Sequence, residues 1–598
     1  SSDLGSLSVS GCYFDNNYTD YYPAGALYIT YATAVITDTD FVNNYSADSG
    51  GAIYNNNSDT TLLRARFLSN STEYDGGAVY AEDGSLSASG CYFNSNYNYD
   101  GDGGAVYNDN VSVLFRDTAF TSNDAEYDGG AIYQQYGSLS MSGCRFRYND
   151  SYYGSGGALY AYDAQLTDNG SQFNDNESND DDGGACYLEY IDAELIGTTF
   201  DNNWAYYSGG AVYQQYGSLS MSGCRFEYNN IEYGSGGAIY AHDGQLTDNR
   251  SQFNGNECYD NYGGACYFDN VGAELIGTTF ENNWTYYSGG AIYHEYGSLS
   301  MSGCVFTSNS TDYYDGGAFY TEYLSSLRCV DTVFFDNFSE EYGGAGVIYR
   351  VPSVTFQNVR FENNGSYENG GALLTYDMNA VFLSCSFVNN VSYTDVGGVS
   401  YLEDSSVSFI DCGFIGNGAS EDGGALWALN VDLSISSCRF IGNETYGSNG
   451  GGAIYSDNGD LTIQDSLFDY NYCDYSYGGA LYAEYASLSA SNCVFTNNYS
   501  GDTGGAGAIY FSIVDIRDTL FDGNQCLLEG GALHTMSING QIRNSVFVDN
   551  HSNNIAGAVY LGNLSFSFVD CSFTNNQSIY TGGDRKSTRL NSSHESPS

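Results

Sequence analysis

The residues whose types and spacing could carry chemistry are, above all, Asn-x-Ser/Thr triplets, the acceptor pattern for N-linked glycans. About nineteen such triplets occur, most of them on an asparagine that lies three residues after a phenylalanine. We predict that several carry glycans, with the loop sites Asn56, Asn110 and Asn563 the best placed. The other candidates lie after phenylalanines or close to them: Asn17, Asn44, Asn70, Asn149, Asn176, Asn283, Asn309, Asn337, Asn364, Asn390, Asn443, Asn498, Asn550 and Asn576.

Clustered carboxylates form a second group with chemical potential. They precede Gly-Gly pairs, and oxygen ligands in glycine-rich loops can bind Ca²⁺. Their spacing does not match an EF-hand, so solvated acidic loops are the competing interpretation, and no other cofactor is predicted. The weak candidate metal ligands are Asp100, Asp102, Asp180, Asp181 and Asp182.

Cysteine is the third group. Ten of the sixteen cysteines lie two residues before a phenylalanine of the repeat. Cys385, Cys412 and Cys438 do so in three successive repeats, where a stacked arrangement would place their Cα atoms about 4.8 Å apart, within the range for a disulfide. A bridge between neighbours and a stack of buried thiols therefore both remain open.

Catalytic chemistry is not indicated, and we predict that the chain is not an enzyme. Polysaccharide-cleaving β-helix enzymes use Lys or Arg, or paired Asp, on one face of the fold. The only lysine of this chain is Lys586 in the C-terminal tail, and the five histidines are dispersed at unlike positions of the repeat. A polysaccharide-cleaving enzyme remains a remote alternative.

All of these residues belong to one sequence repeat, of which Gly289–Asn309 is a representative copy. One anchor is Gly-Gly-Ala-aliphatic-Tyr, as in Gly76–Tyr80, and the other is Phe-x-x-Asn, as in Phe67 and Asn70. The repeat recurs about twenty-two times at intervals of roughly 26–27 residues. Such self-similarity is the signature of a solenoid in which each repeat stacks on the next.

The repeats alternate apolar and polar residues, as in Ser298–Ser302, and this period of two predicts strands. The Gly-Gly pair in each repeat disfavours a helix. Three short strands joined by turns fill one period, so we predict an all-β, single-domain parallel β-helix of about 22 coils. The preference of parallel crossovers predicts that it is right-handed.

The two anchors have a structural use in such a fold. Equivalent phenylalanines would stack along the axis, and glycine would fit sharp corners through a positive φ or through lack of a side chain. The asparagines would form a ladder of side-chain amides between coils. An asparagine held in an internal ladder cannot also carry a glycan, so these two interpretations of the same residue compete.

Net charge excludes some partners. The chain carries a formal charge of −57, which would repel nucleic acid. No apolar segment approaches the roughly 20 residues needed to cross a bilayer, so membrane insertion is not predicted. The segments between the asparagine and the Gly-Gly pair are rich in Tyr, Asp, Asn and Ser. We expect them to form a lengthwise stripe of solvent-exposed, tyrosine-rich loops suited to binding sugars or proteins.

The repeats define the domain organisation. We predict one β-helix domain over residues 1–583, with an internal duplication of three coils, 129–208 and 209–288. Residues 584–598 lack both anchors and resemble translated linker sequence, so we predict that they are an addition and not native chain.

The paired GGA-aliphatic-Tyr and Phe-x-x-Asn motifs resemble the repeat of chlamydial polymorphic outer-membrane proteins, which also occurs in secreted proteins of protists. The resemblance covers residues 1–583 and implies a parallel β-helix at the cell surface, commonly an adhesin. With the many triplets, it favours a secreted, extracellular structural glycoprotein that assembles with itself, end to end or laterally, into a fibre or coat. The alternative is a surface adhesin or glycan-binding module, whose partners would be surface polysaccharides or other cell-surface proteins.

Overall fold

The computed structural model describes residues 5–562 and 565–580, and in these residues every regular element is a β-strand. The chain divides into two compact units, Ser1–Ser298 and Leu299–Ser598. Each unit contains, within the described residues, eleven short strands that carry the motif phenylalanine, one for each coil. The tail predicted at 584–598 lies outside the described residues.

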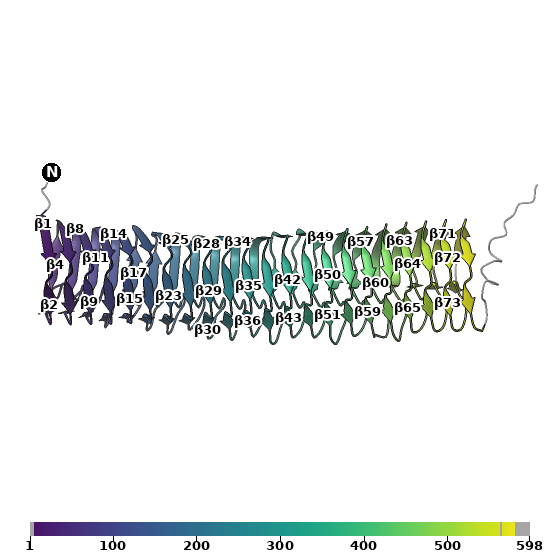
Figure 1. The fold of residues 1–598 in the computed structure, drawn as a ribbon, viewed down its shortest axis with the longest axis horizontal. Coiled ribbons are helices and arrows are strands. Elements are labelled where there is room, and N and C mark those ends of the chain that lie inside the picture. The colour runs from purple at the N-terminus through teal and green to yellow at the C-terminus, as the bar shows by residue number, and fades with distance from the viewer. Residues whose placement is uncertain (1–4, 563–564, 581–598) are drawn as a thin grey trace, which may run out of the picture. The chain divides into compact units, whose positions relative to one another are not determined.

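A coil of the first unit has three strands, which belong to three different sheets. They are β25 (Cys186–Ile196), β26 (Thr199–Asp201) and β27 (Trp204–Ala205). The strand β25 pairs in parallel with β28 (Val212–Ser222) of the next coil, and equivalent residues face each other in register. Figure 1 shows the successive coils of this unit side by side. The predicted parallel β-helix is thereby confirmed.

Coils of the second unit follow the same plan, but the long strand is often divided in two by a turn. One such coil comprises β52 (Ser400–Glu403), β53 (Ser406–Ile410), β54 (Gly413–Ile415) and β55 (Gly418–Ala419). Each of these strands pairs in parallel with its equivalent in the next coil. Any functional site in this unit must therefore be formed by side chains that project from a regular backbone.

The core is made of like residues stacked on like. In β25 the buried residues include Leu188, Ala193 and Leu195, whereas Glu189 and Glu194 point outward, as the alternation predicts. The motif phenylalanines stack face to face, for example Phe146 on Phe173 with ring centroids 4.5 Å apart. Such stacking buries large apolar rings in every coil and fixes the coil-to-coil register.

The two glycines of each corner have different roles. Gly183 has a φ of +70°, in the left-handed region that L-residues with side chains adopt at a cost. Gly184 has an ordinary φ, but a Cβ there would lie 2.3 Å from the carbonyl oxygen of Gly210 in the next coil. Both predicted reasons for glycine thus apply, one to each residue of the pair.

An outward-facing tyrosine stack runs along the first unit. The tyrosine of each GGA-aliphatic-Tyr motif lies over its equivalent, with ring centroids 4.8–5.3 Å apart. The eleven members are Tyr28, Tyr54, Tyr80, Tyr107, Tyr133, Tyr160, Tyr187, Tyr213, Tyr240, Tyr267 and Tyr293. Most of these rings are half-buried.

Candidate functional site

The asparagine three residues after each motif phenylalanine forms a buried ladder. The Nδ2 of Asn176 donates to the Oδ1 of Asn203 in the next coil at 2.9 Å and to the carbonyl oxygen of Phe146 in the preceding coil at 3.2 Å. Its Oδ1 accepts from the backbone and side-chain amides of Asn149. Every donor and acceptor of this amide is therefore used inside the protein.

This arrangement overturns the prediction of glycans at ladder positions. A glycan replaces a hydrogen of Nδ2 and needs solvent around it, but both hydrogens are bonded and the residues are at most 4% exposed. The Ser or Thr of these triplets, such as Ser178, points inward and is buried as well. The correction applies to Asn44, Asn70, Asn149, Asn176, Asn283, Asn309, Asn337, Asn364, Asn390, Asn443, Asn498 and Asn550. Asn576 stays a prediction, because its Nδ2 donates to the carbonyl oxygen of Phe547 but meets no further ladder asparagine within the described residues, and its Ser578 is half-buried.

Other triplets have accessible asparagines. Asn110 is exposed and Asn56 is half-buried, so both stay predictions, as does Asn17, which is half-buried in the first described coil. The sequence predictions missed two more, Asn169 and Asn249, which are exposed at the ends of equivalent strands in the duplicated coils. Asn563 lies outside the described residues.

The three successive cysteines are free thiols stacked in the core. Cys385, Cys412 and Cys438 are at most 2% exposed, and the backbone N–H of Cys412 donates to the sulfur of Cys438 at 3.4 Å. Each thiol also donates to a backbone carbonyl, as Cys412 does to Phe382. Of the two interpretations that the sequence left open, the structure contains the thiol stack.

The aspartates proposed for calcium act as turn residues. The Oδ1 of Asp102 accepts the N–H of Asp128 at 3.0 Å, and the Oδ1 of Asp182 accepts the N–H of Ser208 at 2.7 Å. Asp100 accepts the hydroxyl of Tyr127, while Asp180 is exposed and Asp181 is half-buried. Within the part of the chain that the structure describes, no three His, Cys, Asp or Glu residues gather as metal ligands would.

These turn carboxylates lie in an unfavourable environment for charge. Burial, followed by the repulsion of Asp128, raises the pKa of Asp102 to about 7. Burial likewise raises the pKa of Asp182 to about 7 and that of Asp128 to about 6. The carboxylates of successive coils thus disfavour one another's ionised form.

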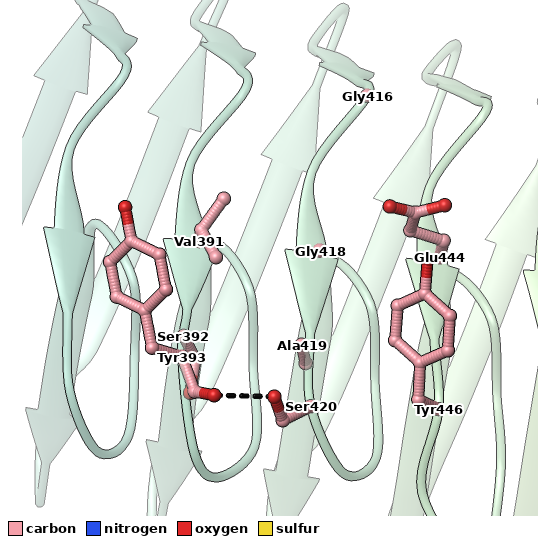
Figure 2. Close-up of a pocket in the computed structure, with 9 residues that line it drawn as sticks. All are labelled: Val391, Ser392, Tyr393, Gly416, Gly418, Ala419, Ser420, Glu444 and Tyr446. Atoms are coloured by element: carbon pink, nitrogen blue, oxygen red, sulfur yellow. Dashed lines mark hydrogen bonds between the residues drawn. The ribbon is translucent and has the colours of Figure 1, made fainter.

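A small notch interrupts the outer surface of the second unit, at the two-residue strand β55. Its volume is about 120 Å³, and nine residues line it: Val391, Ser392, Tyr393, Gly416, Gly418, Ala419, Ser420, Glu444 and Tyr446. They come from three successive coils, through β51 (Val391–Ser392), β55 and β59 (Glu444–Thr445). Figure 2 shows that the middle coil carries only small side chains, whereas its two neighbours carry larger ones.

The notch exists because one coil has two small outward residues. At the first outward position Gly418 lies between Val391 and Glu444, which are its register partners. Two residues later Ser420 stands where the flanking coils have tyrosines, Tyr393 and Tyr446. Because the Gly418 coil has a large side chain at neither position, it leaves a gap one coil wide between its neighbours.

Gly418 is not required by the backbone. Its φ is not in the left-handed region, and a Cβ there would meet nothing closer than the Cγ of Glu444 at 3.6 Å, an ordinary contact. Gly365 occupies the same position two coils earlier, but there a Cβ would lie 3.0 Å from the ring of Tyr393. The tyrosine ring thus covers the gap at Gly365, whereas the gap at Gly418 stays open.

The polar groups of the notch are a carboxylate and hydroxyls. Glu444 is exposed and leans toward the Gly418 coil, while the ring of Tyr446 rises from the coil of Glu444 (Figure 2). Burial and then the neighbouring Glu444 carboxylate raise the pKa of Tyr446, which keeps its hydroxyl protonated. The hydroxyl of Ser420 donates to the carbonyl oxygen of Tyr393 at 2.5 Å.

The sequence predictions missed the notch. Glycine is frequent in this chain, and Gly418 differs from the glycines of the corners only by its place in the period. The available signal was that both outward residues of one coil, Gly418 and Ser420, are small while their equivalents one period away are large. Aligning the repeats position by position reveals it.

Two family models match parts of the chain. The repeat of the Chlamydia polymorphic membrane protein matches residues 38–56 and 197–215, each of which contains a Phe-x-x-Asn and a Gly-Gly-Ala-aliphatic-Tyr motif. A model of the right-handed β-helix region matches residues 220–387. No curated protein sequence matches the chain significantly.

The fold and these matches define the class: a right-handed parallel β-helix protein. Two of its repeats match the Chlamydia polymorphic membrane protein repeat, so the resemblance stated from the sequence motifs is confirmed. Repeats of this type point to a protein of an outer membrane or cell surface. No helix in the described residues is long and apolar enough to cross a bilayer.

Proposed function

We propose that the protein is an extracellular structural component of a cell surface, a β-helix scaffold without catalytic activity. The observation that carries this proposal is the uniformity of the asparagine ladder. In each unit the amides bond from coil to coil, as Asn203 does to Asn229 and Asn471 to Asn498, both at 2.9 Å. A frame this regular supplies rigidity and length, and the described notch holds only one carboxylate and no histidine.

Self-assembly follows from the same regularity. Each coil offers its neighbour matching rows of backbone donors and acceptors, together with the asparagine amides and stacked rings. A coil face that no other coil covers is therefore a template on which a coil of a second copy can add. We propose end-to-end association by this route, with lateral association as the weaker alternative.

Charge sets the conditions for assembly. A net charge of −57 makes copies repel one another, and salt screens this repulsion beyond a Debye length of about 8 Å at physiological ionic strength. Protonation of the turn carboxylates near pH 5 lowers the repulsion further. Assembly should therefore be favoured by salt and by mild acid.

Negative-stain electron microscopy of the purified full chain tests the proposal. We expect single particles at low ionic strength and pH 8, and filaments that lengthen with protein concentration at about 0.15 M salt and pH 5. Particles that keep one length under all of these conditions would contradict self-assembly. Carbohydrate-free filaments would leave the scaffold intact but remove the glycoprotein part of the sequence prediction.

An adhesin is the second candidate, and the exposed tyrosines favour it. The loops between the asparagine and the Gly-Gly corner carry Tyr74, Tyr152, Tyr153 and Tyr207, whose exposures of 44–53% are high for aromatic residues. Exposed tyrosines suit contacts with proteins and sugars. Selective binding on a glycan array by a chain that never assembles would favour the adhesin over the scaffold.

A further inference from the structure

The notch at Gly418 offers hydrogen-bond acceptors but few hydrogen-bond donors to a ligand. The carboxylate of Glu444 is an acceptor only, and the hydroxyl of Ser420 already donates its hydrogen to the carbonyl oxygen of Tyr393 at 2.5 Å. Burial and the neighbouring Glu444 carboxylate raise the pKa of the Tyr446 hydroxyl. A ligand that fits this chemistry must therefore bring donors.

The electrostatic character of the notch is negative. None of its nine lining residues is cationic, and the only carboxylate among them, that of Glu444, is exposed. The whole chain carries a net charge of −57, which draws cations toward the surface before any specific contact forms. Charge complementarity thus favours a cationic group over a neutral one.

The size of the notch narrows the choice. Its volume of about 120 Å³ is slightly below the roughly 150 Å³ of an engineered cavity that holds benzene, which has six heavy atoms. A guanidinium group has four heavy atoms and fits. A pyranose sugar with its substituents has about twice the heavy atoms of benzene, so most of it would remain outside.

We propose that the notch is a binding site for the guanidinium of an arginine side chain presented by a partner protein. The planar cation lies against the face of the Tyr446 ring, where a cation–π contact forms, and two of its N–H groups point to the Glu444 carboxylate. The side chain of Val391, on the opposite wall in Figure 2, packs against the methylenes of the arginine. This site goes beyond the scaffold function and does not depend on it.

The binding test uses the full chain and a labelled peptide, acetyl-Gly-Arg-Gly-amide, followed by fluorescence anisotropy at about 0.15 M salt. The same peptide with citrulline in place of arginine is a neutral analogue of nearly the same shape. Two variants alter the notch: Gly418→Val fills it, and Glu444→Gln removes its charge at constant size. Valine already occurs at this position in Val391, and the new Cβ has room, so Gly418→Val should fold.

A matched control is available in the first unit. Glu177 is exposed and occupies the same position of its coil as Glu444, but its register partners are Asp150 and Trp204, so no bare coil adjoins it. Glu177→Gln therefore removes the same charge from the same position without touching a notch. It separates site binding from general attraction to an acidic surface.

We expect the arginine peptide to bind at least about tenfold more tightly than the citrulline peptide. Gly418→Val and Glu444→Gln should each weaken it at least about tenfold, whereas Glu177→Gln leaves it unchanged. Equal weakening by Glu177→Gln, or no saturable binding by the unaltered chain up to about 1 mM, would overturn the proposal. Equal affinity for the two peptides, or notch-dependent binding of methyl glucoside instead, would overturn it as well.

Discussion

The side-chain amide of Asn176 lies 2.9 Å from the Oδ1 of Asn203, one coil further along the axis, and both residues are fully buried. This contact recurs from coil to coil in each unit and joins the coils independently of the backbone ladder. Because each asparagine both donates and accepts, the loss of one amide leaves groups unpaired in the coils on either side.

Replacing a ladder asparagine should be costly. Asn203→Ala would deprive the backbone N–H and Nδ2 of Asn176, and the carbonyl oxygen of Phe173, of their partners. At roughly 1–3 kcal/mol for each unsatisfied buried group, the free energy of unfolding should fall by about 3 kcal/mol or more. Urea denaturation measures this loss, with the exposed Asn169→Ala as control. A change of less than about 0.5 kcal/mol would contradict the assigned role of the ladder.

Glycan occupancy should follow exposure and not the triplet pattern. In cells that attach N-linked glycans, the folded, protease-resistant fraction should carry them at Asn110, Asn169 and Asn249, and at Asn56 to a smaller extent. Asn176 and the other buried ladder residues should be unmodified. Glycopeptide mass spectrometry decides, and a glycan on Asn176 in folded protein would refute the ladder geometry.

One cysteine should react with thiol reagents faster than the others in the native protein. Cys12 is exposed, and the remaining fifteen cysteines are buried as free thiols. A thiol-specific chromogenic reagent should therefore titrate one group rapidly in the native protein and all sixteen in denaturant. A total of fourteen in denaturant would show one disulfide, and peptide mapping would place it within Cys385, Cys412 and Cys438 or elsewhere.

Stability should fall as the pH rises above the acidic range. Burial raises the pKa of Asp102 and Asp182 to about 7, whereas aspartate in an unfolded chain titrates near 3.9. The folded state therefore binds more protons between these values, and the stabilisation present below about pH 4 is lost as the pH rises through 7. The melting temperature should be higher at pH 5 than at pH 8.

The variant Asp102→Asn tests the cause of this dependence. Asparagine keeps the oxygen that accepts the N–H of Asp128 but carries no charge. It should stabilise the protein at pH 8, by on the order of 1 kcal/mol after allowance for solvent screening, and change little at pH 5. Equal effects at the two pH values would assign the dependence to other groups.

The frame was predictable because its residues recur. Phe67 and Phe93 stand at one position of the period, so a solenoid must place one over the other, and their rings stack at 4.6 Å. The sequence alone could not show whether Asn176 belongs to the ladder or carries a glycan. Burial of its side chain decides between the two, and burial is known only from the three-dimensional structure. The notch at Gly418 depends on the side chains of adjacent coils, which the period does not specify.

X-ray diffraction from an oriented, concentrated solution of the full chain tests most directly the claim that like residues lie over like in a coil-by-coil scaffold. The account predicts a strong reflection at a spacing of about 4.8 Å along the direction of alignment, sharpening as filaments form at pH 5. A diffuse ring without orientation at that spacing, from a sample whose alignment is shown by birefringence, would contradict it.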